Sequence, residues 1–137
     1  MDVCFSCPPG NLVISKPGFE AIVGKQSGKG AVSWKPVACP VGGKVAIRIK
    51  EGSTRDWTAV QIRDSKFAIK SVKLQRDGDS DWKELARAND NYWSATKAGG
   101  GDGGFKLQIT AATEQTIEES IAKGWKGGTV YPGANQY

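Results

Sequence analysis

The stretch that decides the fold is KVAIRIKEGSTRDWTAVQIR, residues 44–63. In its first half Val45, Ile47 and Ile49 alternate with Lys, Ala and Arg, which is the two-residue period of a half-buried strand. The second half repeats this period after a polar turn, so the stretch predicts an antiparallel hairpin. Trp57 falls in phase with the polar positions of the second strand. The pattern therefore predicts an indole on the outer face of a sheet.

The composition fits one domain of ordinary size with many turns and little helix. The chain has 137 residues, of which 39% are hydrophobic, with 18 glycines and one methionine. A net charge of +5 favours an anionic partner, such as an acidic polysaccharide, a nucleic acid or a membrane surface. The basic residues are scattered, however, which weakens the nucleic-acid interpretation. No histidine is present, and this excludes Ser-His and Cys-His nucleophile pairs.

Turn signals recur at short intervals after the hairpin. They separate expected strands at residues 67–75, 82–86, 92–96, 105–109, 116–121 and 128–131. A slip in the alternation near residues 70–71 predicts a β-bulge. With the hairpin, this makes about eight short strands, and the pattern predicts an all-β sandwich or barrel. No stretch is long and apolar enough for a transmembrane helix.

The first forty residues carry weaker signals. Ser15 followed by Pro17 predicts a short helix over residues 18–23. Residues 31–37 are an expected edge strand, because Pro36 cannot donate a hydrogen bond within a sheet. Residues 1–30 do not have the pattern of an independently folded unit.

The three cysteines favour disulfides over a metal site. Cys4 and Cys7 form a C-x-x-C pair, but no second pair and no histidine complete four zinc ligands. An odd number of cysteines fits a piece of a larger disulfide-bonded chain, in which Cys39 pairs outside these residues. The glycine-rich loop at residues 99–104 lacks the Gly-Lys-Ser/Thr ending of a phosphate loop. We therefore expect no metal and no cofactor.

Several segments resemble the expansin family. They are Trp34-Lys-Pro-Val-Ala-Cys39, Gly43-Lys-Val-Ala-Ile-Arg-Ile-Lys-Glu-Gly-Ser53, Trp57-Thr-Ala-Val-Gln-Ile-Arg63, Ser71-Val-Lys-Leu74, Phe105-Lys-Leu-Gln-Ile109 and Gly128-Thr-Val-Tyr-Pro-Gly133. Residues 41–137 look like the C-terminal domain of expansins and expansin-like proteins, which is also the fold of grass-pollen group-2 allergens. Residues 1–40 are similar to the last part of the N-terminal barrel of expansins, followed by a connector.

The resemblance implies an immunoglobulin-like antiparallel β-sandwich of about eight short strands, preceded by a partial double-psi-barrel segment. It implies a non-catalytic protein that binds cellulose or other cell-wall glucans through carbohydrate-binding module family 63. Loosening of the wall without hydrolysis belongs to the same family description. The resemblance also implies an extracellular, secreted monomer with no nucleic-acid or membrane partner.

The resemblance assigns candidate binding residues as well. Trp57 matches one ring of the family's aromatic platform, and Lys50 matches its flanking lysine. Asp56 occupies the adjacent position, which is often aromatic in the family. Tyr92 is the candidate for a second ring, and Gln61 for hydrogen bonds to sugar hydroxyls. The chemistry suits a glucan, because an indole offers a flat apolar face to the C–H groups of a sugar ring.

The remaining tryptophans are expected to be structural. Adjacent strand residues point to opposite faces of a sheet, so Trp93 is expected in the core beside an outward Tyr92. Trp34, Trp82 and Trp125 are likewise expected to support the fold rather than to bind.

Two other function classes remain as alternatives. A lytic enzyme related to family-45 endoglucanases needs two carboxylates that flank a glycosidic bond. The N-terminal segment offers only Asp2 and Glu20, and the essential acid of the family falls at Val13, which cannot transfer a proton. We therefore expect no enzyme. The other alternative is a basic β domain that binds single-stranded nucleic acid, for which binding should collapse as salt rises.

Overall fold

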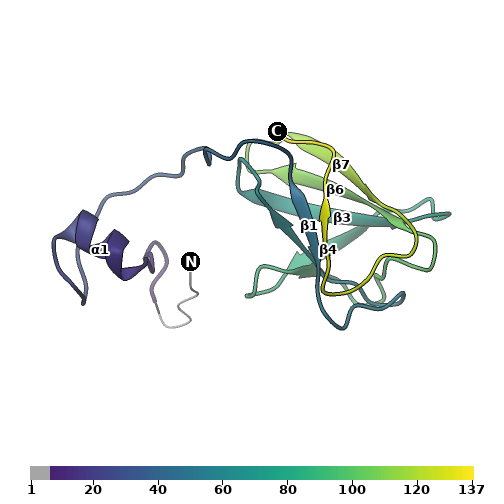
Figure 1. The fold of residues 1–137 in the computed structure, drawn as a ribbon, viewed down its shortest axis with the longest axis horizontal. Coiled ribbons are helices and arrows are strands. Elements are labelled where there is room, and N and C mark those ends of the chain that lie inside the picture. Colours follow the sequence, from purple (N-terminus) through teal and green to yellow (C-terminus); the bar gives the residue numbers. More distant parts are fainter. Residues whose placement is uncertain (1–6) are drawn as a thin grey trace. The chain divides into compact units, whose positions relative to one another are not determined.

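The structure is a computed structural model, in which residues 7–137 are described (Figure 1). The chain divides into two compact units, Met1–Pro36 and Val37–Tyr137. Within residues 7–137, no helix has the length and apolar character that crossing a bilayer requires.

The second unit consists of eight strands joined in one antiparallel ladder. They are β1 (Ala46–Ile49), β2 (Val60–Arg63), β3 (Ile69–Arg76), β4 (Lys83–Arg87), β5 (Trp93–Ser94), β6 (Phe105–Ala111), β7 (Thr116–Ile121) and β8 (Val130–Pro132). The strand order is β7-β6-β3-β4-β5-β2-β1-β8. The prediction of an all-β fold with about eight short strands is confirmed.

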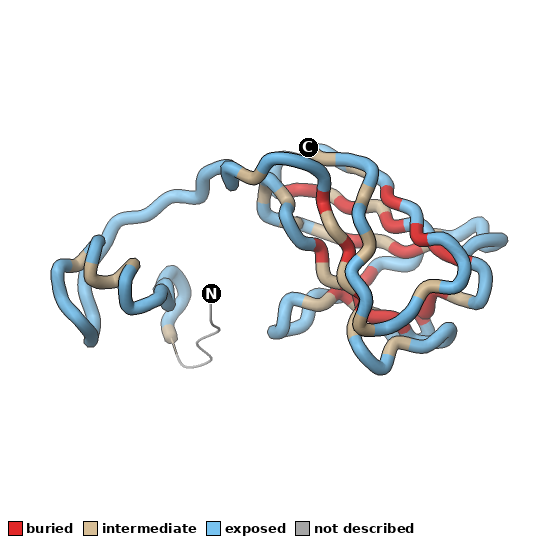
Figure 2. Tube along the Cα trace, in the orientation of Figure 1, coloured by how far each residue is buried: buried red, intermediate tan, exposed pale blue. Residues whose placement is uncertain are grey.

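The strands alternate between the core and solvent as the sequence predicts. Ile47 and Ile49 of β1 are fully buried, and Leu107 and Ile109 of β6 are buried from the other half of the ladder. These residues belong to a single apolar cluster, so the ladder folds back on itself around one core. Figure 2 shows the buried positions recurring along the strands. Burial of each such aliphatic side chain contributes about 1.5–3 kcal/mol to folding.

The predicted bulge is present in β3. The register of β3 against β6 shifts between Ile69 and Ser71, and after this shift Val72 pairs with Ile109. The extra residue restores Val72 and Leu74 to the buried face. The bulge therefore keeps both ends of a long strand in phase with the core.

The C-terminal tail joins the two edges of the ladder. Glu119 of β7 is 3% exposed, and its carboxylate accepts hydrogen bonds from the backbone N–H groups of Ala134 and Asn135, both at 2.7 Å. The carbonyl of Asn135 in turn accepts from the N–H of Val45, next to β1, at 2.9 Å. The tail thus links β7 to the β1 side of the ladder without forming a strand itself.

Tyr137, the last residue of this tail, also contacts the ladder and makes the stability of the fold depend on pH. Its hydroxyl donates to the carbonyl of Ile109 at 3.0 Å, and its ring lies 6.1 Å from that of Phe67. Burial raises the pKa of Tyr137 to about 12, because the phenolate loses solvation. The folded state therefore favours the neutral phenol, and this stabilisation is complete below the unfolded pKa of about 10.

We expect the stabilisation from Tyr137 to be lost as the pH rises from about 10 through about 12. As the pH rises over this window, the melting temperature of the wild type should fall more steeply than that of Tyr137→Phe, which has no ionisable hydroxyl. Melting curves of the two proteins at a series of pH values measure the difference. Parallel profiles would contradict the assignment.

The N-terminal unit contains one helix, α1 (Lys16–Val23). Ser15 precedes it and Gly24 ends it with φ +75°, donating its N–H to the carbonyl of Glu20 at 2.9 Å. The predicted short helix is therefore present, although it begins at Lys16 and makes Pro17 its second residue.

The strand expected at residues 31–37 is wrong. The described part of the chain before β1 contains no strand, and residues 31–37 are all exposed. A strand needs the backbone groups of a neighbouring strand, and this unit offers none to the segment. That residues 1–40 are a barrel remnant stays a prediction.

The structure tests the cysteine predictions only in part, because it describes residues 7–137. Cys39 is exposed and is a free cysteine, so its expected pairing outside this chain stays a prediction. The expected use of Cys4 and Cys7 in disulfides involves Cys4, which lies outside the described residues.

Candidate functional site

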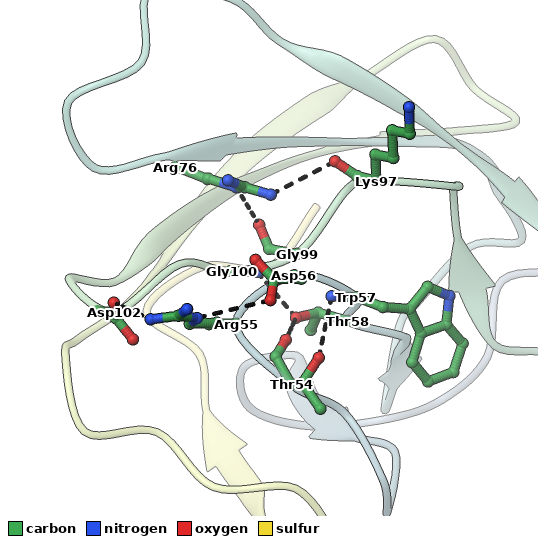
Figure 3. A network of polar contacts seen from close by, with 10 residues as sticks. All are labelled: Thr54, Arg55, Asp56, Trp57, Thr58, Arg76, Lys97, Gly99, Gly100 and Asp102. Carbon is green, nitrogen blue, oxygen red and sulfur yellow. Dashed lines mark hydrogen bonds and ion pairs between the residues drawn. The ribbon is translucent and has the colours of Figure 1, made fainter.

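Trp57 lies at the turn that leads into β2, with its indole exposed. The residue is 38% exposed, and Figure 3 shows its ring pointing away from the surrounding polar contacts. Its N–H donates to Thr54 Oγ1 at 3.2 Å, and its carbonyl accepts from the Thr54 N–H at 2.7 Å. The backbone of Trp57 is thus held on both sides while its ring remains exposed. The expected strand included Trp57, but β2 begins only at Val60, so the indole lies on the preceding turn and not on the strand.

A buried threonine anchors this turn to a distant loop. Thr58 is fully buried, and its hydroxyl donates to the carbonyl of Thr54 at 2.9 Å and accepts from the N–H of Gly100 at 2.8 Å. Its backbone N–H donates to the carbonyl of Ala98 at 3.2 Å. The loop around residues 97–100 therefore supports the position of Trp57 (Figure 3).

Arg76 supports the same loop from β3. Its Nε donates to the carbonyl of Gly99 at 2.7 Å, and its guanidinium also reaches the carbonyl of Lys97 at 3.4 Å. The sequence analysis did not identify this network. One signal was available, since Thr58 is a polar residue in an otherwise apolar inward row.

Arg55 and its carboxylate partners lie beside the turn. The Arg55 guanidinium is 3.3 Å from Asp102 and 3.5 Å from Asp56. The charge of Asp102, and then that of Asp56, raises the pKa of Arg55 above its ordinary value. Both pairs are exposed and contribute little to stability. Asp56, which precedes Trp57 in the chain, is therefore an ion-pair partner of Arg55.

Lys50, Asp90, Tyr92 and Arg48 form a cluster of polar and aromatic groups. Lys50 Nζ is 2.6 Å from Asp90 Oδ2 and 5.0 Å from the centroid of the Tyr92 ring. Arg48 Nε donates to the Tyr92 hydroxyl at 3.0 Å. The hydrogen bond from Lys50, together with the backbone N–H of Tyr92, lowers the pKa of Asp90. The predicted Lys50 and Tyr92 are thus brought together.

This cluster extends over the outer face of β2. Arg48 belongs to β1, Tyr92 directly precedes β5, and β2 lies between these strands in the ladder. Ala59 falls on the outer face by alternation, yet it is only 1% exposed, and its carbonyl accepts from the Lys50 N–H at 2.9 Å. The register pairs Arg48 with Gln61 across the two strands, so Gln61, and not Ala59, lies between Arg48 and Tyr92. Ala59 lies one pair further along, opposite Lys50, and its burial shows that an outward phase does not by itself ensure exposure.

Gln61 is half-buried on the same face. Its Oε1 accepts from Arg63 Nε at 2.8 Å, which leaves the amide group free to donate. In the described residues, no hydrogen bond, ion pair or ring contact joins the Trp57 indole to Lys50 or Tyr92. The indole and the cluster are therefore separate elements of one candidate surface.

The opposite face of the sandwich has a different composition. In β3, β6 and β7 the one aromatic residue is Phe105, which is buried. The outward positions there include Lys73, Gln108 and Glu118, which pair across the strands. The strands β3, β6 and β7 thus present no exposed aromatic side chain.

The other tryptophans behave largely as expected. Trp93 is buried at 5% exposure, and Trp125 packs edge-on to Phe105 at 5.7 Å. Trp34 is 51% exposed, and its indole N–H donates to the carbonyl of Gly10 at 2.9 Å. Val13 is exposed in the N-terminal unit.

Comparisons with known proteins find similarity to expansins and expansin-like proteins. No family model matches the chain. The chain is 30% identical to Expansin-YoaJ of Bacillus subtilis over 120 residues, which cover 88% of this chain and 50% of that protein. It is 33% identical to Expansin-like protein 1 of Dictyostelium discoideum over 92 residues, covering 67% of this chain and 32% of that protein.

Solved structures give the same result. The structure matches an apo expansin of Clavibacter michiganensis with a TM-score of 0.63 at 28% identity, over 73% of this chain and 48% of that one. It matches a mutant expansin of the same organism, in complex with cellohexaose, with a TM-score of 0.61 at 28% identity, over 71% and 46%. The chain spans half or less of the length of these relatives. Together with its sequence motifs, these similarities show that the chain belongs to the expansin family.

Proposed function

We propose that the unit Val37–Tyr137 binds cellulose or a related cell-wall glucan without catalysis, by stacking a sugar ring on Trp57. The observation that carries this proposal is an indole 38% exposed on a turn whose backbone is held on both sides. A backbone fixed in this way loses little conformational entropy on binding. Its flat apolar face suits the C–H face of a glucose unit.

The neighbouring polar groups supply hydrogen bonds at the edge of such a ligand. Lys50, Arg48 and Gln61 offer donors, and Asp90 and the Tyr92 hydroxyl offer acceptors. Their contacts with one another hold these groups in place before a ligand arrives. Tyr92, half-buried beneath Lys50 and Arg48, acts here as a support and hydrogen-bonding group more than as a second open platform ring.

The relatives support the choice of ligand. An expansin of similar fold has been crystallised in complex with cellohexaose. We propose the same glucan class for this chain, together with an extracellular location and a monomeric state. We also propose that this binding contributes to loosening of the wall without hydrolysis. The lytic alternative remains disfavoured by the valine at position 13.

Adsorption to insoluble cellulose tests the proposal. We expect Trp57→Ala to weaken adsorption by about tenfold or more, since burial of a large apolar side chain contributes about 1.5–3 kcal/mol. Trp57→Tyr should retain most of the binding, because it keeps a flat ring. Depletion of protein from solution by microcrystalline cellulose, at several protein concentrations, gives the binding isotherms.

Trp34→Ala is the matched control. It removes an indole that is more exposed, at 51%, but that lies in the N-terminal unit. Its isotherm should match that of the wild type. Equal adsorption of Trp57→Ala and Trp34→Ala would refute the role of Trp57. Strong binding of single-stranded DNA that disappears with salt, without cellulose adsorption, would favour the nucleic-acid alternative.

A further inference from the structure

A hollow lies at one end of the sandwich, where three loops meet. The loops are those between β1 and β2, between β5 and β6, and between β7 and β8. The cavity has a volume of about 400 Å³. Its lining residues are Ser53, Thr54, Arg55, Gly101, Asp102, Gly124, Trp125, Lys126 and Gly127. This volume is at the small end of the range found for ligand sites, about 300–1,000 Å³.

The lining combines donors, acceptors and one aromatic surface. Arg55 and Lys126 donate, Asp102 accepts, and the hydroxyls of Ser53 and Thr54 do both. Three of the lining residues are glycines, so part of the wall is bare backbone. An added Cβ at Gly124 would meet no atom within 4 Å, which shows that the wall is open there.

The aromatic wall is held in a fixed orientation. Trp125 is half-buried, with an edge-to-face contact to the buried Phe105 at 5.7 Å. Its neighbour Lys126 is also fixed through the backbone, because its N–H donates to the Tyr131 hydroxyl at 2.7 Å. Part of the indole therefore lines the cavity while the rest is anchored to the core.

The charges favour a neutral polar ligand over an anion. Arg55 is already paired with Asp102 at 3.3 Å and with Asp56 at 3.5 Å. The ion pair presents a strong donor beside a strong acceptor, and a sugar with adjacent hydroxyl groups can use both. An acidic ligand would instead have to compete with Asp102 for Arg55 and would lie beside that carboxylate.

We propose that this hollow is a second carbohydrate site, which binds one or two units of a neutral hexose chain between Trp125 and the Arg55–Asp102 pair. The choice of sugar rests on the proposed glucan binding, but the residues are different. Figure 3 shows Arg55 and Asp102 on the other side of the residue 54–58 segment from the Trp57 ring. A short soluble sugar can therefore occupy the hollow independently of the Trp57 face.

Nuclear magnetic resonance of the indole N–H groups tests this proposal on the full chain. The five tryptophans give five signals, each assigned by substitution. Titration with cellobiose should shift the Trp125 signal saturably and leave those of Trp34 and Trp93 in place. Asp102→Ala and Lys126→Ala should each weaken this response at least about fivefold. Both side chains are exposed and distant from the core, so both variants should fold.

Matched controls separate the hollow from general surface effects. Asp79→Ala and Lys123→Ala remove exposed charges of the same kinds that do not line the hollow, and they should leave the response unchanged. Asp102→Ala should still adsorb to insoluble cellulose like the wild type. Trp57→Ala should lose adsorption but keep the Trp125 response. Failure of adsorption alone therefore concerns Trp57, and failure of the Trp125 response alone concerns the hollow.

Four results would overturn the second site. One is a Trp125 signal that cellobiose does not move. Another is a response that disappears in Trp57→Ala or persists unchanged in Asp102→Ala, since the sugar would then bind elsewhere. The last is a response to digalacturonate but not to cellobiose, which would assign the hollow to an acidic saccharide.

Discussion

A Gly99→Ala variant is expected to lose both thermal stability and cellulose adsorption. Gly99 is buried in the loop that supports the Trp57 turn, and an added Cβ would overlap the carbonyl oxygen of Arg55 and the carbonyl carbon of Asp56. Both obstacles are backbone atoms, so no side-chain rotation relieves the overlap. Overpacking of this kind typically costs about 1–3 kcal/mol. We expect the melting temperature to fall by about 5–20 °C.

The loss of adsorption follows from the same displacement. Movement of Arg55 and Asp56 also moves Trp57, the next residue in the chain, and weakens the hydrogen bonds that Thr58 makes to the loop. Thermal unfolding measures the loss of stability, and cellulose isotherms recorded well below the melting temperature of the variant measure the loss of adsorption separately.

Gly42→Ala is the control for this prediction. A Cβ at Gly42 meets no atom within 4 Å, and its backbone is outside the left-handed region that requires glycine. This variant should melt and adsorb like the wild type. If Gly99→Ala and Gly42→Ala melt together, the close approach of the loop to the Trp57 turn is wrong.

A Glu119→Ala variant is expected to lose more stability than Glu118→Ala, the substitution of the neighbouring glutamate. Glu119 is 3% exposed, and its carboxylate accepts the backbone N–H groups of Ala134 and Asn135 at 2.7 Å. Removal of the carboxylate leaves these donors without their partner and creates a small void at the edge of the core. We expect a loss of about 2–4 kcal/mol in the free energy of unfolding.

Glu118→Ala provides the comparison within the same strand. Glu118 is exposed, and its side chain makes one long hydrogen bond of 3.3 Å with Gln108. Its removal should change the unfolding free energy by less than about 0.5 kcal/mol. Denaturant unfolding of the two variants measures the difference. Similar midpoints would mean that the tail is not held by Glu119.

Glu119→Gln refines this test. The amide keeps one oxygen that can accept a hydrogen bond but replaces the other with a donor that faces a backbone N–H. We therefore expect an intermediate loss of stability. If Glu119→Gln is as stable as the wild type, the negative charge of Glu119 contributes nothing to holding the C-terminal tail.

The regular strands were predictable because their burial follows local alternation. In β1 and β6 the large apolar residues occupy every second position, so the period of two identifies the strand and its inner face. The slip near residue 70 likewise identified the bulge, because a single extra residue reverses the faces of everything after it. The exposure of Trp57 follows from the same rule.

The failures of sequence reasoning involve contacts between distant segments. Residues 31–37 have a strand-like composition but no partner strand, so they remain extended and exposed. Ala59 has an outward phase, yet it is buried at 1% exposure. Alternation identifies the face on which a residue lies, but not what else reaches that face.

The sequence by itself determined the eight strands, the inner face of each strand, and the outward position of one indole, because these depend on the order of residues along single segments. Only the tertiary structure decided that Thr58 joins the Trp57 turn to the loop at Gly100, that Lys50 and Arg48 converge on Tyr92, and that three loops enclose a hollow beside Trp125. Those arrangements join residues more than forty positions apart. No local pattern records which of the many compatible partners the folded ladder brings into contact.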